Sequence, residues 1–114
     1  MKVGDYVRTY DGVIGKIIDD NFAQEEKRYE LDYNNKLYYF QQIVKSSTNI
    51  IDLIEVGDYV NGKKVIDTFI DYIFDYSEEF KVIRFSETNI LHNANHIKSI
   101  VTKEQFSSMQ YKVN

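Results

Sequence analysis

The chain has 114 residues, with 18 Asp and Glu against 14 Lys and Arg, and a formal net charge of −4. It contains no Cys, which excludes a disulfide scaffold, a thiol nucleophile and a thiolate metal site. No apolar run approaches the ~18 residues of a membrane span, and the first residues lack the apolar core of a signal peptide. We therefore expect a soluble, cytoplasmic protein whose acidic balance argues against a broad nucleic-acid footprint.

One five-residue segment occurs twice. Val3-Gly4-Asp5-Tyr6-Val7 recurs letter for letter as Val56-Gly57-Asp58-Tyr59-Val60, an offset of 53 (56 − 3). An internal repeat close to half the chain length indicates two copies of one structural module. We expect modules at 1–55 and 56–114, packed together because neither is large enough to bury an extensive core alone.

The first module begins with β-hairpin patterns. Residues 6–10 read as a strand, and Asp11-Gly12 is a strong hairpin turn signal. A partner strand is expected over 13–19, ended by Asp20-Asn21, with Gly15 at a bulge or at a close approach of two backbones.

The rest of the first module alternates as a half-buried strand does. Over 27–33, the alternation places Tyr29, Leu31 and Tyr33 on one face. Asn34-Asn35 is expected to turn the chain, which returns over 37–41. A short helical turn is expected over 49–54, with Ser46, Ser47 or Thr48 as its cap.

The second module repeats this plan with a shorter first loop. Asn61-Gly62 is the hairpin dipeptide there, and a strand is expected from Lys64 to Asp67. The segment 66–76 fits either a strand or an amphipathic helix, and its β-branched and aromatic residues favour the strand. Another strand is expected over 80–85.

The end of the second module has a helix start signal. Thr102 and Gln105 form the pattern of a capping box, and the helix is expected to run to about Met109. A last strand is expected over 111–113. Together these elements predict a mainly all-β fold of two tandem SH3-like small barrels, with a short C-terminal helix over about 102–109.

Residues with catalytic or metal-binding chemistry are sparse. His92 and His96 are four apart, as helical zinc ligands can be, but the intervening Asn residues favour a turn. The carboxylates at 19–26 and 71–79 are interpreted as solvated loop charges rather than an acid–base pair. We expect no enzyme activity, no metal and no cofactor.

Cations next to aromatic residues offer one functional hypothesis. SH3-like barrels of the KOW and Tudor types use such surfaces, with bases stacking on aromatic rings. The candidate nucleic-acid-binding residues are Arg8, Lys16, Lys36 and Arg84, near Tyr38, Tyr39 and Lys81.

The tyrosines support a different hypothesis, which we favour. Ten Tyr exceed what two small cores need, and Tyr supplies large contact area at protein interfaces. An acidic, Tyr-rich surface fits a partner with a basic groove, such as a complex that handles nucleic acid. The candidate partner-binding residues lie where the two halves differ: Tyr29, Tyr33, Tyr38, Tyr39, Asp71, Tyr72, Asp75, Glu78 and Glu79.

Three stretches resemble a family of small phage and prophage accessory proteins of low-GC Gram-positive bacteria. They read IVKSS, then NIIDLIEVGDYVNG over 49–62, and IKSIVTKEQF over 97–106; the start VGDYVRT and the ending YKV over 111–113 fit as well. Thr48 stands where members mostly have Pro, which loosens the expected helix start.

The family has no established general activity, but small phage accessory proteins often block host defence, as anti-CRISPR proteins do. The resemblance implies a binding protein in the cytoplasm of the infected or lysogenic host. The implied partner is a host protein or ribonucleoprotein complex, with a CRISPR effector as one candidate.

Overall fold

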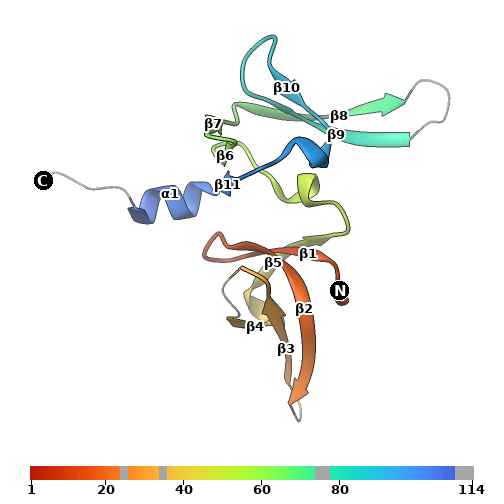
Figure 1. Ribbon diagram of the computed structural model, residues 1–114, viewed down its shortest axis with the longest axis vertical. Coiled ribbons are helices and arrows are strands. Elements are labelled where there is room, and N and C mark those ends of the chain that lie inside the picture. The colour runs from red at the N-terminus through yellow and green to blue at the C-terminus, as the bar shows by residue number, and fades with distance from the viewer. Residues whose placement is uncertain (24–25, 34–35, 74–77, 110–114) are drawn as a thin grey trace, which may run out of the picture. The chain divides into compact units, whose positions relative to one another are not determined.

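A computed structural model describes residues 1–23, 26–33, 36–73 and 78–109; for 21–27 and 72–78 it describes backbone only, where that backbone lies in a strand. The fold is mainly β, as expected, with one short helix near its C-terminal end (Figure 1). The chain divides into two compact units, Met1–Leu53 and Ile54–Asn114. The boundary expected from the repeat lies two residues further along the chain.

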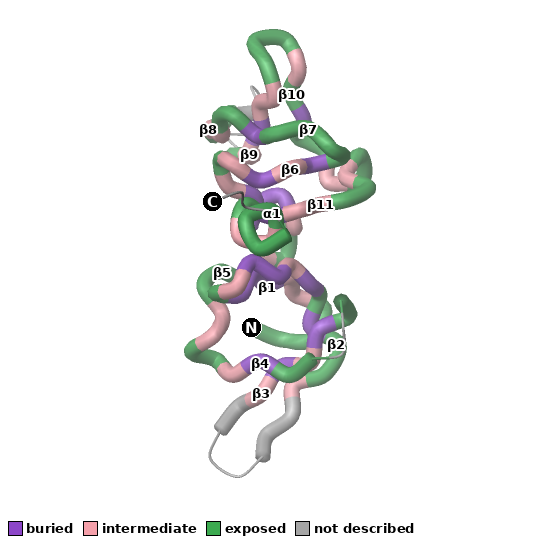
Figure 2. The backbone as a smooth tube through the Cα atoms, turned by 90° about the vertical axis from the view of Figure 1, so that its left-hand side faces the viewer, coloured by how far each residue is buried: buried purple, intermediate pink, exposed green. Residues whose placement is uncertain are grey.

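Unit 1 is a five-stranded antiparallel sheet in the order β4-β3-β2-β1-β5. Its core consists of Val7, Val13, Ile17, Tyr29, Leu31 and Tyr38, and the purple segments of Figure 2 trace it along these strands. Its elements are β1 (Tyr6–Thr9), β2 (Ile14–Ala23), β3 (Glu26–Leu31), β4 (Leu37–Tyr39), the 3-10 helix η1 (Phe40–Gln42), β5 (Ile43–Ser47) and the 3-10 helix η2 (Ile50–Leu53).

Unit 2 contains two three-stranded antiparallel sheets, β10-β9-β8 and β11-β6-β7. The segment 66–76, for which strand was favoured over helix, forms the strand β8 from Asp67 to Ile73. The elements are β6 (Tyr59–Val60), β7 (Lys63–Lys64), β8 (Asp67–Ile73), β9 (Glu78–Arg84), β10 (Ile90–Leu91), the 3-10 helix η3 (Ala94–His96), β11 (Ile100–Val101) and α1 (Lys103–Met109).

The repeated pentapeptide forms the same turn in both units. Gly4 and Gly57 have φ of +97° and +98°, and each lies at the third position of a four-residue turn. The turns close through Asp5 N–H to the Lys2 carbonyl at 3.0 Å and Asp58 N–H to the Glu55 carbonyl at 3.1 Å. Only Gly adopts this geometry without strain, which explains why the pattern is repeated.

The two units also share one topology. In unit 1, β5 pairs with β1, and β4 with β3; in unit 2, β11 pairs with β6, and β10 with β9. A 3-10 helix stands before the last strand of each unit, and a helical segment follows that strand. The long β2 of unit 1 corresponds to β7 and β8, which are separated at Val65 and Ile66.

Several expected boundaries were wrong. β2 does not end at Asp20-Asn21 but continues to Ala23, because it pairs with β3 as far as Glu26. The returning strand, expected over 37–41, ends at Tyr39, and η1 begins at Phe40. The expected strand from Lys64 to Asp67 is broken between β7 and β8. The described strands form open sheets rather than closed barrels.

The local turn and cap signals were more reliable. The 11–12 turn is present, although its loop also includes Tyr10, since the Thr9 N–H donates to the Val13 carbonyl at 2.9 Å. Gly15 lies at a close approach, where an added Cβ would come within 3.1 Å of the Leu31 Cβ. The capping box is present, with Thr102 N–H to Gln105 Oε1 at 3.1 Å and Gln105 N–H to Thr102 Oγ1 at 3.3 Å.

The start of η2 differs from the expected cap. Asn49, rather than the preceding Ser or Thr residues, accepts the Ile51 N–H through its side-chain oxygen at 3.2 Å. Ser47 accepts the Asn49 N–H at 3.1 Å and thereby supports that turn. The expected turn at Asn34-Asn35 and the expected strand over 111–113 lie outside the described residues.

Candidate partner-binding site

Two of the tyrosines expected at the surface are core residues. Tyr29 on β3 and Tyr38 on β4 are cross-strand neighbours, and their exposed fractions are 2% and 0%. The period-two pattern correctly placed Tyr29 with Leu31, and that shared face is buried. Because both side chains are enclosed by their own unit, we leave them out of the candidate surface.

The other two tyrosines of unit 1 are accessible to different degrees. Tyr33 follows the end of β3, so it leaves the buried face of that strand and is 61% exposed. Tyr39 is half-buried, and the Arg28 guanidinium carbon lies 5.0 Å from its ring centroid. This cation–π pair joins β3 to β4 and occupies one face of the ring.

The candidate residues of unit 2 gather on the β8–β9 hairpin. Asp71 is opposite Phe80, and Tyr72 is opposite Glu79, in the antiparallel register. Asp71 and Glu79 are exposed. Since successive residues of a strand face opposite sides, Asp71 and Glu79 belong to different faces of the hairpin. Glu78 pairs with Ile73 by backbone register, and Asp75 lies outside the described residues.

An aromatic and apolar group covers one face of the β10-β9-β8 sheet. The register places Asp67, Arg84 and Ile90 in one row, and Phe69 beside Val82 in the next. The Arg84 guanidinium carbon lies 5.0 Å from the Phe69 ring centroid. The rings of Phe80 and His92 are 5.4 Å apart at 56°. We call this surface the Phe80 face: Phe69, Phe80, Val82, Arg84, Ile90 and His92.

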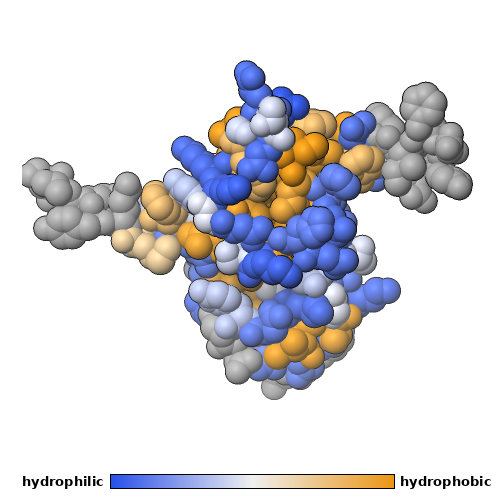
Figure 3. All heavy atoms as spheres, turned by 45° about the horizontal axis from the view of Figure 1, so that its top comes forward, coloured by the Kyte–Doolittle hydropathy of each residue, from blue (hydrophilic) through white to orange (hydrophobic). Residues whose placement is uncertain are grey.

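The Phe80 face combines an apolar centre with an acidic border. Val82 at its middle is only 2% exposed, whereas Ile90 is 48% exposed. Asp67 and Asp71 occupy the same side of β8 as Phe69 and are exposed. Aromatic and Arg side chains within a polar border are typical of protein interfaces. On the face of the molecule drawn in Figure 3, apolar side chains reach the surface among hydrophilic ones.

Of the Phe80 face, sequence reasoning had singled out Arg84 as a nucleic-acid-binding candidate and His92 as a possible metal ligand, and it had selected Asp71 at the border as a partner-binding candidate. The sequence did indicate that Phe80 and Val82 share a face, because the expected strand over 80–85 put both on one side. Ile90 and His92 could not be added to them, since their position depends on the pairing of β10 with β9.

The four cations proposed for nucleic-acid binding are divided between the two units, three in unit 1 and one in unit 2. Arg8 is 1% exposed, and its guanidinium donates to the Leu53 carbonyl at 3.0 Å, so it is a structural residue. The ammonium of Lys16 lies 5.4 Å from the Tyr6 ring centroid, and that of Lys36 lies 5.1 Å from the Tyr38 ring centroid. Arg84 belongs to the Phe80 face in unit 2.

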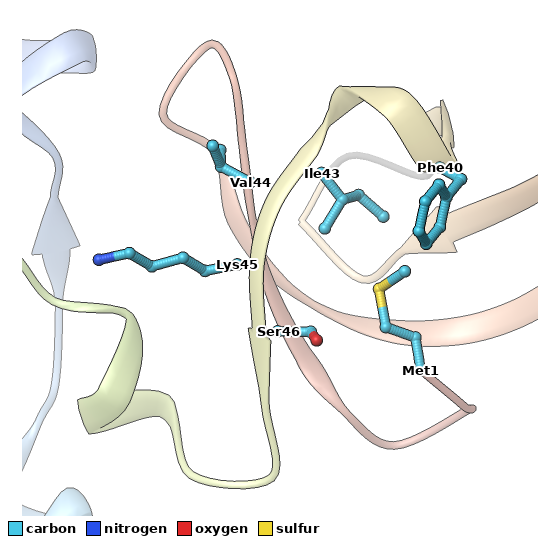
Figure 4. A pocket seen from close by; sticks show the side chains of 6 residues that line it. All are labelled: Met1, Phe40, Ile43, Val44, Lys45 and Ser46. Carbon is cyan, nitrogen blue, oxygen red and sulfur yellow. The ribbon is translucent and has the colours of Figure 1, made fainter.

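An open depression lies beside β5 of unit 1. Figure 4 shows the side chains of Met1, Phe40 and Ile43 converging on one side of the strand, while Val44 and Lys45 point away. Phe40 and Val44 are 60% and 64% exposed. The sequence predicted neither the strand β5 nor a depression, which depends on Met1 approaching the strand.

The histidine pair does not form a ligand set. The His92 ring contacts the Phe80 ring in a tilted arrangement, whereas His96 lies in η3 and its carbonyl accepts a hydrogen bond from the Asn61 side-chain amide at 2.9 Å. Within the described ranges, no three His, Asp or Glu side chains gather as metal ligands. No described helix is long and apolar enough to cross a membrane.

Comparison with known proteins adds no relative. The chain matches no protein-family model, no curated protein and no solved structure. The candidate site therefore depends on the geometry of the described residues.

Proposed function

We propose that this chain is a non-enzymatic binding protein whose Phe80 face contacts a protein partner. The observation that supports this most directly is a difference between equivalent positions of the two units. Arg84 and Ile90 are paired on β9 and β10, and Glu30 and Leu37 are the corresponding pair on β3 and β4. The repeated framework is the same in both units, but Val82 at the centre of the Phe80 face corresponds by this register to the charged Arg28 on β3.

The proposal extends to the fold of each unit. We interpret both as SH3-like modules, supported by the strand order of unit 1 and by the 3-10 helix that precedes the last strand of each unit. Such small frameworks tolerate different residues at exposed positions while keeping their turns and cores. A duplicated framework with one modified face suits partner-specific binding.

The proposed partner is a host defence complex, contacted by a phage- or prophage-encoded inhibitor in the host cytoplasm. This identification is supported by the resemblance to phage accessory proteins, and a CRISPR effector is one candidate. The exposed carboxylates Asp67 and Asp71 border the Phe80 face, and the chain has a net charge of −4. Both complement a groove that binds nucleic acid through basic residues.

The proposal is tested with two arginine substitutions on one sheet. Ile90 on the Phe80 face and Ile70 on the opposite face are 48% and 52% exposed, so they form a matched pair. The chain is expressed in a host with an active CRISPR system, and the plating efficiency of a targeted phage is measured. We expect the wild-type chain and Ile70→Arg to restore plating, and Ile90→Arg to fail.

Affinity capture from the same hosts provides the second measurement. The tagged wild-type chain and Ile70→Arg should retain the same defence complex, and Ile90→Arg should lose it by at least about tenfold, since a charge in an interface core is costly. The proposal is rejected if both substitutions act alike, or if the wild-type chain leaves plating unchanged in every defence-positive host tested.

A further inference from the structure

Exposed cations flank the turn between β6 and β7. Because β7 is an edge strand of its sheet, its successive residues Lys63 and Lys64 lie on opposite faces of that edge. Lys63 and Lys64 form β7, and His96 and Lys98 come from the segment that follows β10; all four are exposed. None of them was among the cations that sequence reasoning selected. We call these four residues the Asn61 patch, after the residue that holds its two segments together.

Asn61 fixes the turn against residues 96–99 through four hydrogen bonds. Its backbone N–H donates to the Ser99 carbonyl at 2.9 Å, and its side-chain amide donates to the His96 carbonyl at 2.9 Å. Its side-chain oxygen accepts the N–H groups of Lys98 at 2.7 Å and Ser99 at 3.2 Å. Lysines distant in sequence are thereby placed around one rigid turn.

No acidic residue is contributed by either segment of the patch. Residues 59–66 and 88–103 contain no Asp or Glu, although the chain has 18 of them. Asp58, just before the first segment, is 0% exposed and accepts the N–H groups of Glu55 and Lys103. Among the described residues, no carboxylate forms an ion pair with Lys63, Lys64 or Lys98, in contrast to Lys103, which pairs with Glu55 at 2.7 Å.

The equivalent positions of unit 1 lack the two successive lysines. By the pairing of β1 with β2 and of β6 with β7, Lys64 corresponds to Lys16, and Lys63 to Gly15. By the pairing with the last strand, Lys98 corresponds to Val44. Gly15 is buried, and Lys16 lies over the Tyr6 ring. Exposed lysines occur in both units, since Lys45 occupies the position of Ser99, but unit 2 differs from unit 1 in having two successive exposed lysines on an edge strand.

We propose that the Asn61 patch binds the phosphate backbone of a nucleic acid. Lys ammonium groups are strong phosphate contacts that supply affinity without sequence selection. A protein partner fits the patch less well, because interface cores are depleted in Lys and enriched in aromatic side chains. No exposed large hydrophobic residue lies among residues 61–64 or 94–99. This site uses none of the residues of the Phe80 face.

The test measures fluorescence anisotropy of labelled poly(U), poly(dT) and a DNA duplex with the full chain. The key variant is Lys63→Gln/Lys64→Gln/Lys98→Gln. The control is Lys16→Gln/Lys36→Gln/Lys45→Gln, which removes the same charge from exposed lysines of unit 1. We expect the key variant to lose at least about tenfold in affinity at about 50 mM salt, and the control to stay within about twofold.

The salt dependence and a competitor complete the test. Three phosphate contacts predict a slope of log K against log salt of about −2 for single strands, which should fall close to zero in the key variant. Absence of binding by the wild-type chain, equal losses in both variants, or equal displacement by poly-L-glutamate would overturn the proposal. Circular dichroism melting checks that both variants fold. The affinity for nucleic acid measured in this way does not depend on the outcome of the Ile90→Arg experiment.

Discussion

The aspartate of the repeated pentapeptide has different contacts in the two units. In unit 2, the Asp58 carboxylate accepts the Glu55 N–H at 2.8 Å and the Lys103 N–H at 2.9 Å, and it is fully buried. In unit 1, Asp5 is half-buried and accepts the Lys2 N–H at 3.1 Å. Both aspartates occupy the same position of the same turn, but Asp58 in unit 2 also caps the first turn of α1.

This difference gives a matched pair of substitutions. Asp58→Ala leaves two backbone N–H groups without their acceptor, one of them at a helix start, and should lower the free energy of unfolding by about 2–4 kcal/mol. Asp5→Ala removes a more exposed hydrogen bond and should cost roughly 1 kcal/mol or less. Urea denaturation followed by circular dichroism measures both. Equal losses would show that the cap to α1 contributes nothing.

Single residues also show where sequence reasoning reaches its limit. The alternation around Tyr29 was read correctly, but its buried side was taken as available to a partner. Arg8 looked like a surface cation because Arg is rarely buried, and only the fold reveals the Leu53 carbonyl beside its guanidinium. Burial of a polar residue depends on a partner 45 positions away, which no local pattern reports.

At the scale of elements, α1 shows how a seven-residue helix is held in place. Its first turn is capped by Thr102 and by Asp58, and Phe106 stacks on Tyr59 of β6 with ring centroids 4.7 Å apart. Isolated helices of this length are not stable in water. The helix therefore depends on its cap and on this stacking contact.

Removal of the threonine cap tests that dependence. Thr102→Ala should lower the free energy of unfolding by about 1 kcal/mol, since it leaves the Gln105 N–H without its acceptor. The control is Ser107→Ala, at an exposed helix position, which should change stability by less than about 0.5 kcal/mol. Thermal melts of both variants provide the measurement. A cap variant as stable as the control would contradict this account.

The β8–β9 hairpin and the Asn61 patch differ in how far the sequence predicts them. Ile70, Tyr72 and Ile73 favoured a strand through their β-branched and aromatic side chains, and that preference was correct over the described part. The patch could not be predicted, because it requires Asn61 to contact residues 96–99. Turns can be predicted because they depend on neighbouring residues, whereas the grouping of charges depends on contacts between segments that are distant in the sequence.

At the scale of the whole molecule, the chain consists of two units with one topology. The repeated turn, the duplication and the capping box were expected from the sequence, whereas β5, β10, β11 and the 3-10 helices η1 and η3 were not. The closed barrels and several strand ends were not found as expected, because pairing between strands decides how far each strand runs. Turns and cores constrain the sequence more strongly than exposed faces do. The frameworks of the two units therefore agree, while their candidate surfaces differ.

The two-unit organisation predicts local responses to core damage. Val7 and Val60 occupy the same place in the repeat, and both are 0% exposed. The core cluster that contains Val7 consists of unit 1 residues. Val7→Ala should therefore lower the stability of unit 1 by about 1.5–3 kcal/mol and leave unit 2 unchanged, with the reverse for Val60→Ala.

Hydrogen exchange resolved along the chain distinguishes the two outcomes. Amides of the altered unit should exchange faster, while those of the other unit keep the wild-type rate. Faster exchange in both units after either substitution would mean that the chain unfolds as one cooperative body.

The four hydrogen bonds of Asn61 have a chemical consequence. In an Asn-Gly pair, the backbone nitrogen of Gly meets little steric resistance when it attacks the carbonyl carbon of the Asn side chain. A succinimide forms and the amide nitrogen leaves as ammonia, and hydrolysis of the succinimide by water then gives a carboxylate. In the folded chain this amide is engaged with His96, Lys98 and Ser99. Deamidation of Asn61 should therefore proceed mainly from the opened turn and place a carboxylate among the lysines. The rate of Asn61 deamidation in a stored sample would therefore report how often the turn between β6 and β7 opens.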